Sequence, residues 1–97
     1  MSRLDVVCAP DGAGWACEVR TDQDGRRTEH AVTIDPAGVA GLASPATIDD
    51  AERLVETTFE FLLERESSAS ILASFDLAVV SRYFPEYPRE IRRRLER

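Results

Sequence analysis

Three short stretches in which apolar and polar residues alternate constrain the fold of this chain more than any other feature. They cover about 4–8, 15–21 and 26–34, and strict alternation is typical of strands that bury one face. Gly12 and Gly25 lie in the two connections, where hairpin loops favour a residue that adopts positive φ. The pattern therefore predicts a three-stranded antiparallel meander.

The turn positions also predict a register for the meander. A pivot at 12–13 places Cys8 opposite Cys17, and a pivot at 23–24 places Cys17 opposite His30. Both pivots bring the less polar residues of all three strands to one face of the sheet. That face is expected to hold Leu4, Val6, Cys8, Trp15, Cys17, Val19, Thr21, Thr28, His30, Val32 and Ile34.

A long helix is predicted after the meander. Thr47 and Asp50 have the spacing of a capping box, and the helical pattern continues to about Glu66. Its apolar side spans about 200°, which is wider than the stripe of an ordinary surface helix. One sheet face cannot cover so wide an arc, so we expect either the C-terminal segment or a second subunit to pack on the remainder.

The C-terminal third of the chain gives a less regular pattern. Ile71, Leu72 and Phe75 suggest a short helix, and Asp76 is placed to cap another helix over 77–84, although residues 77–84 also fit a fourth strand. Pro88 suits the first turn of a last helix. The prediction for 1–97 is a single α+β domain, a three-stranded antiparallel meander packed against one long helix and followed by short C-terminal helices.

The two cysteines are predicted to be free thiols. The N-terminal residues do not form a signal peptide, which favours a cytoplasmic location, where thiols stay reduced. With His30, Cys8 and Cys17 also fit a weak alternative, either a metal site or a regulated disulfide. A structural zinc site needs a fourth ligand and a tighter motif, so we expect neither a metal nor a cofactor.

Catalytic motifs are missing from the sequence. It has one histidine, no serine in a nucleophile turn and no glycine-rich phosphate loop. The acidic residues of the long helix fit a solvated face better than a pair of carboxylates acting as acid and base. We therefore predict that the protein is not an enzyme, and that it has no small-molecule substrate and no membrane segment.

Charge is distributed unevenly along the chain. The formal net charge is −6, acidic residues outnumber basic ones over 1–66, and basic residues outnumber acidic ones over 67–97. Nucleic-acid binding depends on cations that meet phosphates, so an acidic body makes this function unlikely. The arginine-rich last helix leaves one alternative open, a nucleic-acid-binding accessory protein.

The aromatic and basic residues near the C-terminus are the best candidates for partner binding. Tyrosine, phenylalanine and arginine are enriched at protein interfaces, although an aromatic side chain here can equally pack the last helix onto the core. The protein is therefore expected to be a non-catalytic protein–protein interaction domain that forms a homodimer or binds another protein. The predicted partner-binding residues are Tyr83, Phe84, Tyr87, Arg89, Arg92 and Arg93.

The order of three strands and a helix from Leu4 to Arg65 resembles, in topology, the small domain of HicB-type antitoxins. This resemblance implies a partner-neutralising module that binds a toxin nuclease. The chain lacks the aspartate-proline-glycine signature of that family after the second strand. Its C-terminal part also matches neither the ribbon-helix-helix nor the helix-turn-helix of the family.

Overall fold

The fold is a four-stranded mixed sheet covered on one face by helices. The computed structural model describes residues 2–96. The strands stand in the order β1-β2-β3-β4; the first three form an antiparallel meander, and β4 runs parallel to β3. Their bounds are Ser2–Asp11 for β1, Gly14–Gln23 for β2, Arg26–Ile34 for β3 and Ser74–Asp76 for β4.

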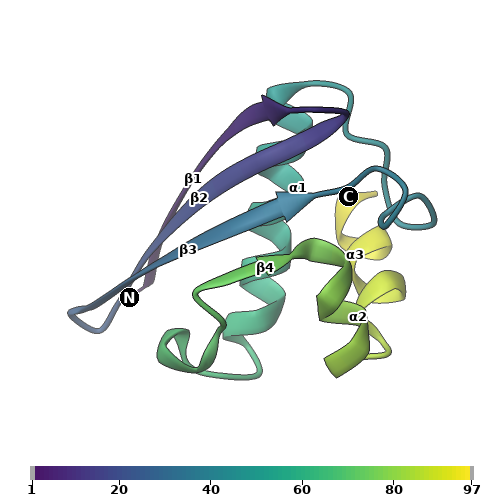
Figure 1. The fold of residues 1–97 in the computed structure, drawn as a ribbon. Coiled ribbons are helices and arrows are strands. Elements are labelled where there is room, and N and C mark those ends of the chain that lie inside the picture. Colours follow the sequence, from purple (N-terminus) through teal and green to yellow (C-terminus); the bar gives the residue numbers. More distant parts are fainter. Residues whose placement is uncertain (1, 97) are drawn as a thin grey trace.

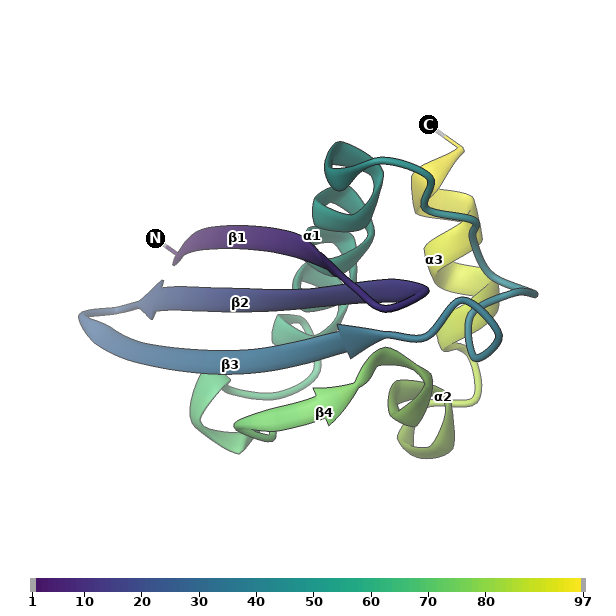
Figure 2. The same cartoon turned by 45° about the horizontal axis from the view of Figure 1, so that its top comes forward.

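One long helix and several short ones form the second layer. Figures 1 and 2 show α1 lying across one face of the sheet and α3 beside α1, beyond the ends of the strands. None of the described helices is long and apolar enough to cross a membrane. The helices are α1 at Ile48–Leu63, α2 at Val80–Tyr83 and α3 at Tyr87–Leu95, with 3-10 turns at Ser68–Ser70 and Leu77–Val79. The α+β class and the meander on one long helix are therefore confirmed.

The register of the first hairpin is confirmed, whereas that of the second is wrong by two residues. Cys8 lies opposite Cys17, as predicted, but His30 lies opposite Val19 instead of Cys17. The cause is the loop, since the second hairpin turns on Asp24 and Gly25, which both adopt positive φ. A shift of two residues keeps every side chain on its predicted face, so the apolar face is unchanged.

The capping box at the start of α1 forms as predicted. The Thr47 hydroxyl accepts a hydrogen bond from the Asp50 N–H at 3.1 Å, and the Asp50 carboxylate accepts one from the Thr47 N–H at 3.3 Å. These bonds satisfy N–H groups that have no partner inside the first turn of a helix. The helix ends at Leu63, a few residues before the predicted end near Glu66.

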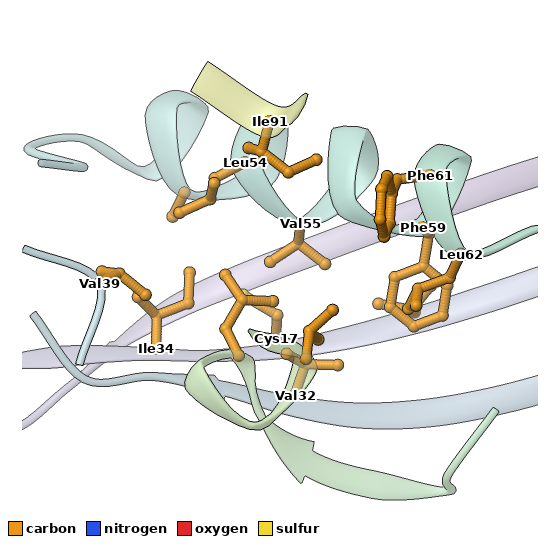
Figure 3. Packing of buried hydrophobic residues seen from close by; sticks show 14 of the residues in the cluster. Cys17, Val32, Ile34, Val39, Leu54, Val55, Phe59, Phe61, Leu62 and Ile91 are labelled. Carbon is orange, nitrogen blue, oxygen red and sulfur yellow. The ribbon is translucent and has the colours of Figure 1, made fainter. Parts of the chain in front are cut away.

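The wide apolar arc of α1 is covered on two sides by its own chain. Val55 and Phe59 point toward the strands (Figure 3), and the Phe59 ring lies 5.2 Å from the ring of His30. On another side, Phe61 meets Tyr87 at 5.4 Å between ring centroids, and Ile91 of α3 is fully buried. Of the two covers that the sequence allows for this arc, the structure has the C-terminal segment.

The structure of residues 71–76 differs from the short helix predicted for them. The segment forms no helix, because Phe75 enters the sheet opposite Val32 and so gives β4 its parallel pairing with β3. The prediction for 77–84 is confirmed as helical, a 3-10 turn followed by α2, and the Asp76 carboxylate caps it by accepting from the Ala78 N–H at 3.0 Å. Pro88 lies in the first turn of α3, as predicted.

The prediction of free thiols is wrong. Cys8 and Cys17 form a disulfide between β1 and β2, and their Cα atoms are 4.0 Å apart. The Cys8 N–H donates to the Glu52 carboxylate at 3.0 Å, so the two cysteines form a non-hydrogen-bonded pair, the kind in which side chains come closest. The predicted register already placed Cys8 opposite Cys17, and this pairing is a better guide to the redox state of the two cysteines than the N-terminal residues are.

The disulfide predicts the outcome of a thiol titration. In denaturant without reductant, we expect no reactive thiol, and after reduction we expect two per chain, because both cysteines are consumed by one bond. The measurement is a colorimetric titration of the purified protein, with alkylation at lysis to prevent oxidation in air. Two thiols per chain before reduction would contradict the bond.

Candidate protein-binding surface

An apolar hollow lies beside β4 and carries two of the most exposed large apolar side chains of the described chain. Leu72 is 51% exposed and Tyr83 is 67% exposed, and the hollow that they border has a volume of about 340 Å³. Most of its lining is apolar, which distinguishes it from the charged hollows elsewhere on the surface. The hollow, called the β4 groove below, is lined by Leu62, Glu66, Ser70, Ile71, Leu72, Phe75, Val79, Val80, Tyr83 and Phe84.

The two walls of the β4 groove come from segments on either side of β4. In both Figures 1 and 2, the connection from α1 to β4 lies at one end of the strand and α2 lies at the other. Leu62 lies near the end of α1, and Phe75 belongs to β4, where its ring lies 6.1 Å from that of Phe59. The groove therefore stands on the main core and has a fixed shape.

A buried histidine holds the Leu72 wall in place. His30 is 5% exposed, and its Nδ1 bonds the Leu72 carbonyl at 2.7 Å. A carbonyl only accepts, so Nδ1 carries the proton. Nε2 bonds the Thr28 hydroxyl at 2.9 Å, and this hydroxyl also bonds that of Thr21. His30 thus has a positioning role in the fold and is not exposed at a catalytic centre.

Glu66, which lines the β4 groove, and Arg82, the neighbour in sequence of the lining residue Tyr83, have no ion-pair partner among residues 2–96. Glu66 lies on the wall formed by the α1–β4 connection, and Arg82 is exposed on α2. The two residues thus belong to the segments on either side of the groove, Glu66 to the α1–β4 connection and Arg82 to α2. A surface of this kind can pair with a surface that carries the same charges in the reverse order.

The aromatic residues predicted to bind a partner divide into one surface residue and two packing residues. Tyr83 is exposed, whereas Phe84 is half-buried and its ring lies 5.7 Å from Phe61. Tyr87 is 1% exposed, and its hydroxyl bonds that of Thr58 at 2.7 Å. Tyr83 and Phe84 are therefore available at the groove. Tyr87 belongs to the core, so the prediction that it binds a partner at the surface is corrected.

The predicted arginines lie on α3, outside the β4 groove. Arg89 and Arg92 are exposed, and Arg93 pairs with Glu90 at 2.6 Å. Arg94 bonds Glu64 at 2.7 Å, and this bond lowers the pKa of the Glu64 carboxyl below its usual value. The acidic side of α1 and the basic face of α3 thus meet in part within one chain.

The solvent-facing side of the sheet is polar and largely self-paired. Arg20 pairs with Glu29 at 3.2 Å and Arg27 with Asp22 at 3.6 Å, in both cases across neighbouring strands. Val7, at 66% exposed, is the large apolar side chain on this side. Scattered exposed apolar residues are normal, so this face gives no comparable sign of a binding site.

The predicted row of Cys8, Cys17 and His30 does not form, because the shifted register separates His30 from the cysteines. Within residues 2–96, no group of three histidine, cysteine, aspartate or glutamate side chains is arranged to hold a metal ion.

Sequence reasoning missed Leu72 and the two rim charges as parts of a site. The sequence predicts a short helix at Leu72, in which side chains on the same helical face would cover part of the leucine. The signal that favours an irregular segment is the serine-rich stretch before it, at 67–70, which interrupts the helical pattern. Glu66 and Arg82 are far apart in the sequence, and only the return of the chain beside β4 brings them to one groove.

Searches against protein-family models, curated proteins and solved structures found no match for this chain. The topological resemblance to HicB-type antitoxins therefore stays a prediction.

Proposed function

We propose that the protein is a non-catalytic protein–protein interaction domain that self-associates through the β4 groove. The observation that carries this proposal is the pair of exposed apolar side chains, Leu72 and Tyr83, at the rim of an apolar hollow. A large aromatic side chain in water costs free energy that burial in an interface recovers. The part of the apolar arc of α1 that the sheet leaves open is covered by α3. This arc therefore gives no support to self-association.

A second copy is the occupant that the groove fits best. The surface carries a protruding tyrosine and a recess side by side, which is what an interface between identical surfaces requires. A two-fold axis through the groove places the α2 wall of one copy against the α1–β4 wall of the other. Tyr83 then meets the partner's wall near Leu72, and Arg82 comes close to the partner's Glu66. Neither charge has an ion-pair partner among residues 2–96 of its own chain, and each gains one in the dimer.

Nucleic-acid binding has less support from the arrangement of the arginines. Arg93 and Arg94 are engaged by Glu90 and Glu64, so part of the charge on α3 is neutralised within the chain. Arg89 and Arg92 remain exposed, but the chain as a whole carries a net charge of −6. Because phosphate contacts need a positive surface, we favour the interaction domain.

Sedimentation equilibrium should show a dimer at tens of micromolar, and Tyr83→Ala should weaken that dimer by about tenfold or more. Central aromatic side chains typically dominate interface energies, and two-fold symmetry removes the contact twice. The matched control is Val7→Ala, which removes an equally exposed apolar side chain from the far side of the sheet. A monomer at all concentrations, or equal dimers for both variants, would refute self-association through the groove.

A charge exchange tests the rim pair separately. Glu66→Arg and Arg82→Glu should each weaken the dimer several-fold, since each brings like charges together. The double variant should restore it, because the pair forms again with its signs reversed. Exposed pairs contribute only about 0–1 kcal/mol, so these effects should stay below that of Tyr83→Ala. Weakening that the double variant does not reverse would contradict the proposed pairing of walls.

A further inference from the structure

We infer that the two copies join edge to edge through β4, so that the sheet continues across the dimer as eight strands. This inference rests on the proposed function and adds to it the strand that makes the contact. β4 is an outer strand of the sheet, at the end of the order β1-β2-β3-β4. Phe75 of β4 lines the β4 groove, so a copy seated in the groove lies beside this strand.

The pairing of β4 with β3 determines which backbone groups face the open edge. The Ala31 N–H donates to the Ala73 carbonyl at 2.8 Å, and Phe75 continues this ladder opposite Val32. In a strand, successive residues direct their N–H and C=O groups to opposite sides. Ser74 therefore directs its N–H and C=O away from β3, and the Asp76 N–H points the same way. These are the groups that a further strand would bond.

The opposite edge of the sheet is protected over the second half of β1, at Cys8 and Pro10. On β1, the Cys8 N–H points outward and is already bonded to the Glu52 carboxylate at 3.0 Å. Pro10, two residues later, shares this orientation and has no N–H to offer. Proteins commonly protect an edge strand with proline or with a covering side chain to prevent strand addition. The described part of β4 has no comparable protection at Ser74.

Antiparallel pairing of β4 with its symmetry mate agrees with the contacts proposed for the groove. A two-fold axis perpendicular to the sheet at Phe75 sets Ser74 opposite the mate's Asp76, and their outward backbone groups then face each other. The same axis keeps both helical layers on one side and brings α2 against the mate's α1–β4 connection. One axis therefore satisfies the strand edge, the apolar walls and the rim charges of Glu66 and Arg82.

Hydrogen exchange of the wild-type chain, followed by NMR at several protein concentrations, tests this edge directly. The Ser74 amide should exchange at least tenfold more slowly in the dimer than in the monomer, since it gains a hydrogen bond only on association. Leu4 and Val6, whose N–H groups point outward on β1, serve as internal controls and should be unaffected. Sedimentation of the same samples gives the fraction of dimer.

A pair of variants gives a second measurement. Ser74→Pro removes the outward N–H without removing a bond to β3, and it should weaken the dimer by tenfold or more. Ser74→Ala keeps the N–H and should leave the dimer unchanged. A dimer by mass with no slowing at Ser74, or one equally strong in both variants, would overturn the edge pairing and leave the groove dimer standing. A monomer at every concentration would overturn both.

Discussion

Phe61→Ala should lower the free energy of unfolding by about 3–5 kcal/mol, the usual cost of truncating a fully buried phenylalanine. Phe61 has no exposed surface, and its ring meets those of Phe84 and Tyr87 at 5.7 Å and 5.4 Å between centroids. The Arg65 guanidinium lies 3.7 Å from the ring centroid on the solvent side. The alanine variant therefore loses the aromatic contacts of α1 with Phe84, at the end of α2, and with Tyr87 of α3.

Urea denaturation at constant pH measures this loss. Val7→Ala is the matched control, because Val7 is 66% exposed and its truncation should change the free energy of unfolding by less than about 0.5 kcal/mol. Leu54→Ala, also in the core, should cost about 2–5 kcal/mol. A midpoint for Phe61→Ala equal to that of the wild type would show that α2 and α3 do not pack on α1 in solution.

The strands and α1 could be predicted because their signals are local. Alternation alone places the strand faces, and the Thr47 hydroxyl and Asp50 carboxylate needed for the cap are three residues apart. The predicted register of the second hairpin is wrong by two residues, because both registers place the same side chains on the apolar face. Only the backbone conformation of Asp24, a non-glycine residue at positive φ, decides between them.

β4 could not be predicted, because its cause is distant in the sequence. Phe75 is in a strand only because Val32 lies beside it, 43 positions earlier, and because the His30 ring bonds the Leu72 carbonyl. The prediction of free thiols was wrong for another reason. The predicted register already placed Cys8 opposite Cys17, yet a bond between them depends on the redox environment, which the sequence does not state directly.

The candidate site was predicted in part. Residue type selected Tyr83 and Phe84, which line the groove, but the same criterion selected Tyr87, which is in the core. An aromatic residue favours burial in a core and burial in an interface for the same physical reason, so composition alone cannot separate the two. Helical spacing helps, since Tyr87 and Ile91 are four apart and share the buried face of α3.

The core position of Tyr87 also determines how the protein responds to alkaline pH. Its burial raises the pKa of the phenol well above the usual value, against the smaller opposing effect of the hydrogen bond with Thr58. An unfolded chain loses this proton near pH 10. Above that pH the unfolded state binds fewer protons than the folded state, so stability must fall as pH rises. Below it, both states are protonated and Tyr87 adds no pH dependence.

We therefore expect the free energy of unfolding to fall by about 1.4 kcal/mol per pH unit above pH 10 from this residue alone. Tyr87→Phe is the control, because it keeps the ring against Phe61 and removes the proton that titrates. At neutral pH it should cost about 1 kcal/mol for the lost bond to Thr58, whose hydroxyl keeps its bond to the Leu54 carbonyl. Urea midpoints of both proteins between pH 8 and about pH 11.5 make the comparison. The two curves should converge above pH 10 and then cross, since a loss of about 1.4 kcal/mol per pH unit exceeds the lead of about 1 kcal/mol that the bond to Thr58 gives the wild type. Curves that stay parallel would mean that Tyr87 ionises equally in both states, and hence that α3 does not bury it.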